Sequence, residues 1–179
     1  MGKTIMVVDD EADIRETVKA VLEKEVSNIL RRFKSKKICY ITLNKSCGAM
    51  REIFGKVKLN PDRVDYVDGI SYSIGSPKAV KGCKYVKTPY DLDPIAKEVK
   101  KAINAGASVV IFDSLSNLLA YGSSAPAGIN LLKDFIGSFS KDLEENNGDA
   151  VFLCKKSDAQ NLLIEETIPT FHKVVGKKK

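Results

Sequence analysis

The sequence predicts an α/β protein of three layers, in which helices cover both faces of a mostly parallel, five-stranded central sheet. Short apolar runs alternate along the chain with amphipathic helical stretches, which is the pattern of successive βαβ units. The apolar runs hardly alternate with polar residues, as expected for strands that are buried on both faces.

Five runs have the length and composition of strands. Val, Ile and aromatic residues, which favour strands, dominate the two clearest, 108–112 (SVVIF) and 150–154 (AVFLC). The other three are 4–8 (TIMVV), 38–43 (ICYITL) and the weaker 63–67 (RVDYV).

Helices are predicted between the strands because apolar residues recur there every three to four positions. Gly106 and the pair Asn147-Gly148 are typical helix-ending signals. The predicted helices are 13–33, 47–54, 94–104, 129–146 and a short one within 158–166. Two stretches rich in Gly, Ser and Pro, 69–82 and 122–128, are expected to be surface loops.

Length and composition indicate one ordinary globular domain. The 179 residues are enough for one core and short for two. We expect a single domain over residues 1–176 and a basic tail at 177–179. No apolar run approaches the roughly 20 residues of a membrane helix. The start of the chain lacks the pattern of a signal peptide, so the expected location is the cytoplasm.

The net charge of +6 does not by itself indicate nucleic-acid binding. Much of it lies in residues 31–37 and in the lysine tail, where a basic helix end and a solvated tail explain it. Aromatic residues do not interleave with these charges as a base-stacking surface requires. Nucleic acid is therefore a partner that the sequence allows but does not favour.

The cysteines and the single histidine do not form a recognisable site. Cys39, Cys47, Cys83 and Cys154 lack metal-ligand spacing, so neither a structural disulfide nor a metal site is expected from them. His172 has no partner of ligand type nearby, and we expect it at the surface or at an edge, without a catalytic role.

The residues that follow the predicted strands carry the candidate site, because ligands bind beyond the carboxyl ends of an open parallel sheet. Asp9 and Asp10 follow the first strand and Asp113 follows the fourth; together they are the candidate magnesium ligands. Polar residues also follow strands simply because strands end in solvent, and this second interpretation stays open.

Three further residues at the same edge are candidates for contacting phosphate. Ser114 follows the fourth strand, and Lys155 and Lys156 follow the fifth. A hydroxyl and an ammonium group beside a metal ion could hold an anionic group.

The first residues carry a family resemblance. Residues 3–25, KTIMVVDDEADIRETVKAVLEKE, closely resemble the start of a response-regulator receiver domain. The resemblance implies that Asp9 and Asp10 bind magnesium and that Asp68, after the third strand, accepts a phosphoryl group. It also implies that the serine after strand four and a lysine after strand five complete the site. After residue 25 the family's glycine and second strand are missing, and the later spacings are longer than the family's.

The remainder of the chain, residues 28–175, resembles archaeal KaiC/RecA-like ATPase relatives through ICYITLNKS, VDYVDGIS and above all VVIFDSLSNLLAY. The last segment resembles a Walker B strand, which implies that Asp113 orients magnesium or water near nucleotide phosphates. The phosphate-binding loop GxxxxGK[ST] is absent: residues 9–13 (DDEAD) stand in its place and would repel phosphate. ATP is therefore not expected as a cofactor. No complete catalytic set is present, so the sequence leans away from an enzyme.

The two resemblances meet between residues 25 and 28, so a divergent natural family and an engineered chimera both fit the sequence. They also predict different strand orders. A RecA-like order is expected to place strand 108–112 beside strand 4–8, whereas a flavodoxin-like receiver order places strand 63–67 there.

Three functions follow from these observations. The leading hypothesis is a non-catalytic signalling or regulatory domain of RecA/KaiC-like ancestry that acts through protein partners. The alternative is a magnesium-dependent phosphoacceptor domain of a two-component phosphorelay. A weaker alternative is a nucleic-acid-associated accessory protein.

Overall fold

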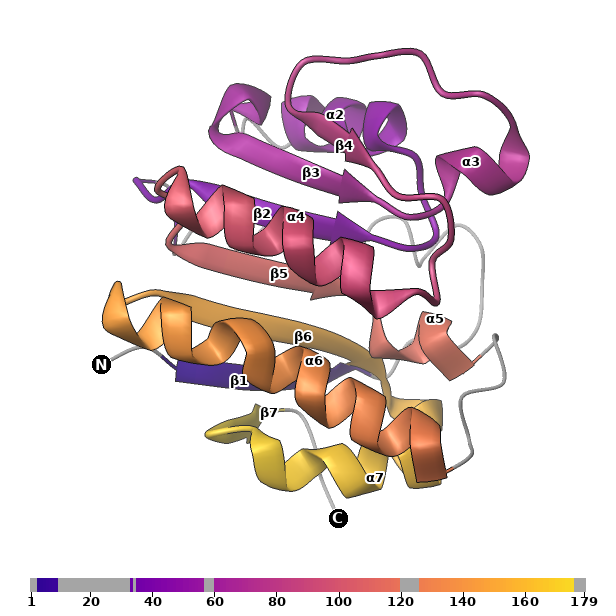
Figure 1. Ribbon diagram of the computed structural model, residues 1–179, viewed down its shortest axis with the longest axis vertical. Helices are drawn as coiled ribbons and strands as arrows, with labels where there is room; N and C mark the ends of the chain where they lie inside the picture. Colours follow the sequence, from indigo (N-terminus) through magenta and orange to yellow (C-terminus); the bar gives the residue numbers. More distant parts are fainter. Residues whose placement is uncertain (1–2, 10–32, 34, 57–59, 120–125, 176–179) are drawn as a thin grey trace.

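The sheet is parallel throughout and has seven strands in the order β4-β3-β2-β5-β6-β1-β7 (Figure 1). The computed structural model describes residues 3–9, 33, 35–56, 60–119 and 126–175. The strands are β1 (Lys3–Asp9), β2 (Ile38–Thr42), β3 (Val64–Asp68), β4 (Cys83–Tyr85), β5 (Val109–Asp113), β6 (Asp149–Lys155) and β7 (Lys173–Val175). The α-helices are α2 (Cys47–Lys56), α3 (Ser71–Ile74), α4 (Leu92–Asn104), α5 (Leu115–Leu119), α6 (Pro126–Glu145) and α7 (Leu162–Thr167).

The five predicted strands are confirmed as β1, β2, β3, β5 and β6. Two three-residue strands, β4 and β7, extend the sheet at its two ends and were not predicted, because so short a run leaves no periodic signal. Helices α2, α4, α6 and α7 confirm four predicted helices, while the prediction for 13–33 falls almost wholly outside the described residues.

Both predicted loops need correction. Residues 71–74 of the first form the short helix α3, and the described part of the second, 126–128, is the beginning of α6. The remainder of the first loop, from Gly75 to Gly82, contains no helix or strand, as predicted. Proline at the start of a helix is favourable, so Pro126 suits the first position of α6.

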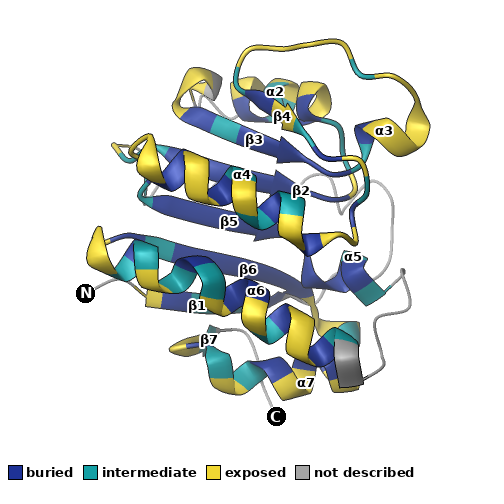
Figure 2. Ribbon diagram, in the orientation of Figure 1, coloured by how far each residue is buried: buried dark blue, intermediate teal, exposed yellow. Residues whose placement is uncertain are grey.

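The central strands are buried on both faces, with alternate residues in two separate apolar cores. Cys39 and Ile41 of β2 face the core under α4 and α6, while Ile38 and Tyr40 face the core under α2. Figure 1 shows α4 and α6 side by side over one face of the sheet. In Figure 2 the strands behind these helices are dark blue, which marks buried residues. This is the predicted arrangement of helix layers on both faces of a sheet.

The position of β1 corrects both predictions of which strand lies beside it. β1 pairs with β6 along its whole length, from Lys3 opposite Asp149 to Asp9 opposite Lys155, and with β7 on its other side. Neither β5 nor β3 adjoins β1, so both neighbour predictions are wrong. The physical reason is that residues 150–154 of β6 are buried and need a paired strand on each side, which β5 and β1 supply.

A disulfide joins Cys47, the first residue of α2, to Cys83 in β4, with 6.1 Å between their Cα atoms. The expectation of no structural disulfide is therefore wrong. Sequence spacing detects only cysteines that are close together in the chain, whereas these two are 36 residues apart. They meet because β4, which carries Cys83, is the edge strand beside β3. Cys39 and Cys154 are buried free thiols within strands, as predicted.

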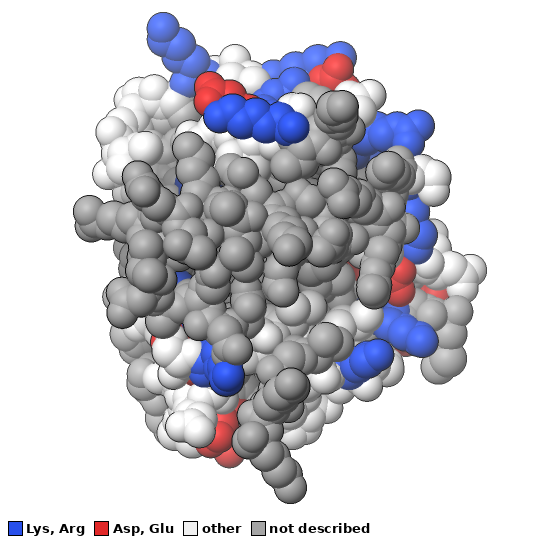
Figure 3. Space-filling model, turned by 180° about the vertical axis from the view of Figure 1, so that it is seen from behind, with Lys and Arg blue, Asp and Glu red and all other residues white. Residues whose placement is uncertain are grey.

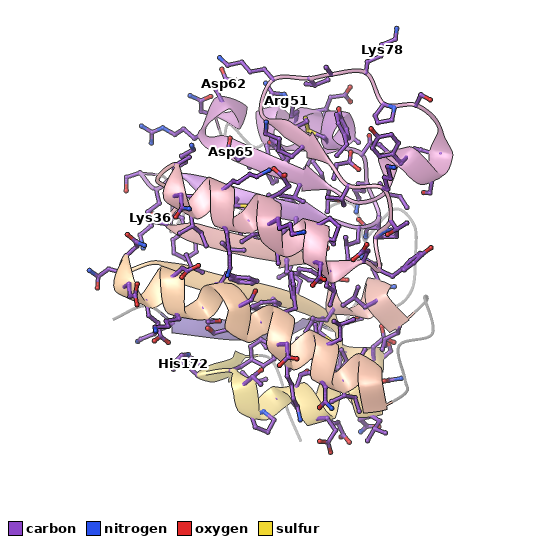
Figure 4. All side chains as sticks on the ribbon, in the orientation of Figure 1. Lys36, Arg51, Asp62, Asp65, Lys78 and His172 are labelled. Carbon is purple, nitrogen blue, oxygen red and sulfur yellow. A yellow bond between two sulfur atoms is a disulfide. The ribbon has the colours of Figure 1, made fainter. Side chains whose placement is uncertain are left out.

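His172 and two ion pairs link the strands near their amino ends (Figure 4). The backbone N–H of Thr4 donates to Nδ1 of His172 at 3.0 Å, which joins β1 to the segment before β7. Lys36 pairs with Asp149 at 3.0 Å and Lys37 with Asp65 at 2.9 Å. The part of the basic cluster at 31–37 that the structure describes is thus used in ion pairs. No described helix is long and apolar enough to cross a membrane.

Gly148, in the turn between α6 and β6, tests this packing. An added Cβ would lie 2.7 Å from Cδ2 of Leu143 and 2.9 Å from the carbonyl oxygen of Ser108. We expect Gly148→Ala to lower the free energy of unfolding by about 1–3 kcal/mol through overpacking. The matched control is Gly137→Ala on the exposed face of α6, where nothing lies within 4 Å. It should stabilise by about 0.5–1 kcal/mol. Urea unfolding measures both, and equal effects would contradict the packing described here.

Candidate functional site

Polar residues of three neighbouring strands form one row at the carboxyl edge of the sheet. Thr42 is the register partner of Asp68 on one side and of Asp113 on the other. All three side chains are buried, so this edge differs from strand ends that run out into solvent. The interpretation of these polar residues as ordinary strand ends therefore does not describe Asp68 or Asp113.

Asp113 is a buried carboxylate held by a tyrosine. It is 6% exposed, and the hydroxyl of Tyr40 donates to its Oδ2 at 2.6 Å. Burial raises the pKa of Asp113 above its ordinary value, against the opposing effects of the Tyr40 hydrogen bond and the positive charge of Lys45. Burial and the nearby Asp113 charge also raise the pKa of the Tyr40 hydroxyl, so it stays a donor.

Asp68 is the centre of a turn. It is fully buried, and its Oδ1 accepts hydrogen bonds from the N–H groups of Ile70 and Ser71 at 3.0 and 2.8 Å. Its Oδ2 accepts from the N–H of Cys47 at 2.7 Å and from the hydroxyl of Ser71 at 2.6 Å. Both oxygens are therefore engaged within the protein. The assignment of Asp68 as phosphoacceptor stays a prediction, and it requires this turn to open.

The connection from β2 to α2 lies beside these two carboxylates. The hydroxyl of Thr42 donates to the carbonyl of Lys45 at 2.8 Å, and Oγ of Ser46 accepts from the N–H of Ala49 at 3.3 Å. These bonds form a tight turn into the helix and bring the charge of Lys45 near Asp113. Sequence reasoning missed Tyr40, Lys45 and Ser71 as partners of the carboxylates. Strand register brings Tyr40 to Asp113, while Ser71 meets Asp68 in a local turn that has no apolar period.

The end of β6 carries the two predicted lysines. Lys155 and Lys156 are exposed, and the backbone N–H of Lys155 donates to Oγ of Ser116 at 2.8 Å. Ser114 is buried directly after Asp113, and the peptide bond between the two is cis. The structure thus places Ser114 at the edge with Asp113, and the lysines one strand further along.

The predicted magnesium ligands come from strands that are not neighbours. β6 separates β5 from β1, so the ends of those strands lie roughly 10 Å apart, two strand spacings. Asp10 and the side chain of Asp9 lie outside the described residues. Among the residues that the structure describes, no three His, Cys, Asp or Glu side chains group as metal ligands. The magnesium site stays a prediction.

Two solved structures share this architecture. A KaiC-like protein from the hyperthermophilic archaeon Pyrococcus horikoshii matches 86% of this chain with a TM-score of 0.50 and 12% identity. The RadB recombinase matches 92% of it with a TM-score of 0.53 and 11% identity. This chain spans 61% of the KaiC-like protein and 71% of RadB. No protein-family profile and no curated protein sequence matches the chain.

These likenesses define the fold as RecA/KaiC-like, the class expected from residues 28–175. They do not extend to activity at such low identity. Neither matched structure is a receiver domain, and the strand order expected for a receiver is wrong. The receiver interpretation of residues 3–25 and the chimera hypothesis have no support from these comparisons.

Asp113→Asn tests the electrostatics of the site. Burial makes the charged form of Asp113 costly in the native state, and this raises the pKa of Asp113. The contribution of Asp113 to the free energy of unfolding is therefore greatest at low pH and is lost as the pH rises through the native pKa. Asparagine does not ionise and can still accept from Tyr40. As the pH rises from 4 to 7, we therefore expect the free energy of unfolding of the variant to increase relative to that of the wild type. The increase should be on the order of 1 kcal/mol per pH unit until the native pKa of Asp113 is passed.

The measurement is urea unfolding across that pH range. Asp134→Asn, at an exposed position on α6, is the control for removing one carboxylate. A stability difference between Asp113→Asn and the wild type that is the same at every pH would contradict the raised pKa.

Proposed function

We propose that this chain is a non-catalytic regulatory domain with a RecA/KaiC-like fold, which acts in signalling through protein partners. The observation that carries the proposal is the internal use of both described carboxylates at the carboxyl edge. Asp113 is capped by Tyr40, and Asp68 is bound by four donors of its own turn and of α2.

The state of Asp113 supports a regulatory role over ATP hydrolysis. A carboxylate that orients magnesium beside nucleotide phosphates has to be ionised and open to the metal. Asp113 is 6% exposed, its pKa is raised by burial, and one of its oxygens is taken by a 2.6 Å hydrogen bond. Its present contacts suit a structural role in joining β2 to β5.

The segments that follow β1 and β2 give a second argument. A phosphate-binding loop needs glycines so that successive backbone N–H groups can surround the phosphates. Residues 10–13 after β1 are DEAD in sequence, and residues 43–46 after β2 are LNKS; neither contains glycine. These sequences favour loss of nucleotide chemistry in this chain, whatever the activities of the KaiC-like protein and the RadB recombinase.

Binding of ATP or of a phosphoryl mimic tests the proposal. With magnesium and 1 mM ATP we expect no hydrolysis and a shift of the unfolding midpoint below about 1 °C, the limit for a ligand whose Kd exceeds its concentration. The same is expected with magnesium and beryllofluoride.

Two results would contradict the proposal. Magnesium-dependent hydrolysis that is lost in Asp113→Ala would show an ATPase. Stabilisation by beryllofluoride that is lost in Asp68→Asn, measured against that variant's own midpoint, would show a phosphoacceptor. Asp134→Asn serves as the control in both assays.

We also propose a cytoplasmic location. Lasting disulfides are uncommon in that reducing compartment. In such a compartment we expect the Cys47–Cys83 disulfide of the structure to be reduced. Both cysteines should then be labelled as free thiols when cells are lysed directly into denaturant with an alkylating reagent. The Cys39 and Cys154 thiols, which form no disulfide, are the internal controls. Protection of Cys47 and Cys83 alone would indicate a lasting disulfide and count against this location.

A further inference from the structure

The exposed large apolar residues gather on one part of the molecule. Six such residues occur among those the structure describes, and four of them lie between residues 72 and 90. They are Tyr72 (47% exposed), Ile74 (74%), Val80 (40%) and Tyr90 (53%). Figure 2 shows this part, α3 and the segment from α3 to β4, as an almost continuous exposed stretch at one end of the sheet. Clustered apolar residues of this kind mark interaction surfaces.

Local contacts hold this stretch in place. The rings of Tyr72 and Tyr85 meet edge to face with centroids 6.4 Å apart, which joins α3 to β4. The hydroxyl of Tyr85 donates to the carbonyl of Lys78 at 3.0 Å, which ties the long segment back to β4. Gly69 lies against Pro89, where an added Cβ would be 3.2 Å from the proline Cα, so the chain before Tyr90 is close to the start of α3.

The same part of the chain is positively charged. Residues 71–101 contain seven lysines and three carboxylates, a net charge of +4 against +6 for the whole chain. The lysines are Lys78, Lys81, Lys84, Lys87, Lys97, Lys100 and Lys101. The first four are spaced three residues apart in a largely extended segment. Of the seven, only Lys101 forms an ion pair with a residue that the structure describes, Glu98 at 2.6 Å.

Part of this charge lies at the outer end of the sheet, whereas Lys97, Lys100 and Lys101 belong to α4, which covers one face of the sheet (Figure 1). Figure 4 shows Lys78 pointing away from the molecule between α3 and β4. Seen from behind in Figure 3, basic side chains gather along the upper border, the end of the molecule that holds α2, β3 and β4. This distribution creates a local positive field that attracts acidic partners.

A cleft of about 350 Å³ lies between the end of β4 and α4. Three lysines line it, together with two carboxylates and with apolar and hydroxyl-bearing side chains: Lys87, Lys97, Lys101, Asp91, Glu98, Tyr85, Val86, Thr88 and Pro94. Glu98 pairs with Lys101, so Lys87 and Lys97 supply the positive charge that an acidic ligand with apolar side chains would meet.

We propose that residues 72–101, the lysine–tyrosine surface, dock an acidic segment of a protein partner that also carries aromatic or aliphatic side chains. The inference rests on the proposed function, for which it supplies the partner-binding surface. Lysines give electrostatic complementarity and fast association, while Tyr72, Ile74 and Tyr90 supply apolar contacts of the kind that dominate protein interfaces.

The composition of the surface favours a protein over a nucleic acid. Ile74 and Val80 offer aliphatic contacts that nucleic-acid backbones do not use. The Tyr72 and Tyr85 rings pack edge to face on each other and are not laid out as successive stacking platforms.

The test uses fluorescence anisotropy of the full chain with three labelled probes. The first is a peptide in which glutamates and aspartates flank two phenylalanines; in the second, serines replace the phenylalanines; the third is a short oligothymidylate. Two double variants, Lys87→Glu/Lys97→Glu and Tyr72→Ala/Ile74→Ala, change the charge and the apolar part of the surface separately. Lys141→Glu/Lys173→Glu, at exposed lysines of α6 and β7, is the charge-matched control. Circular dichroism confirms that each variant is folded.

We expect the first peptide to bind saturably and more tightly than the other two probes. Its affinity should fall at least about tenfold in both surface variants and less than about twofold in the control. Absence of saturable binding, or equal loss in the control variant, would overturn the inference. So would tighter binding of the oligothymidylate that is lost in Lys87→Glu/Lys97→Glu. ATP hydrolysis by the wild type would end the proposed non-catalytic function and leave the peptide result standing, so the two failures are distinguishable.

Discussion

A parallel sheet has to be covered on both faces, because each connection between its strands crosses one face and the strands carry apolar side chains on both sides. In this chain β2 and β5 are buried at every position, and their alternate residues belong to two separate cores. This double burial determines where helices can lie. Because all seven strands are parallel, their carboxyl ends lie along one edge of the sheet, which is where the polar residues of the candidate site meet.

The two buried carboxylates at that edge have different hydrogen-bond partners. Asp68 has four hydrogen-bond donors from its own turn and from α2, so its lone pairs are satisfied without solvent. Asp113 has a hydrogen bond from Tyr40, and its pKa remains raised. A costly charge at a buried edge marks functional ancestry or function in many proteins. Here its contacts favour a structural use, which is why we assign regulation to this fold before catalysis.

The proposed docking surface adjoins that edge, since α3 begins at Ser71, which donates to Asp68, and Tyr85 is the register partner of Asp68. It depends on different physics. It is built from exposed lysines and apolar side chains on α3, β4 and α4, at the end of the sheet where β4 is the outermost strand. Ring and backbone contacts around Tyr85 hold it against the body of the domain. A rigid core with a charged, partly apolar margin can therefore bind a partner without nucleotide chemistry.

The sequence by itself determined the fold class, the five long strands and the helices over 47–54, 94–104 and 129–146, because burial of one or both faces imposes a local apolar period. It also placed Asp68, Asp113 and Ser114 after strands. Tertiary structure alone decided that β6 separates β5 from β1, that Tyr40 reaches Asp113, and that Cys47 meets Cys83. These contacts join residues 36 or more positions apart. They depend on which strands are neighbours, and local periodicity carries no information on that order.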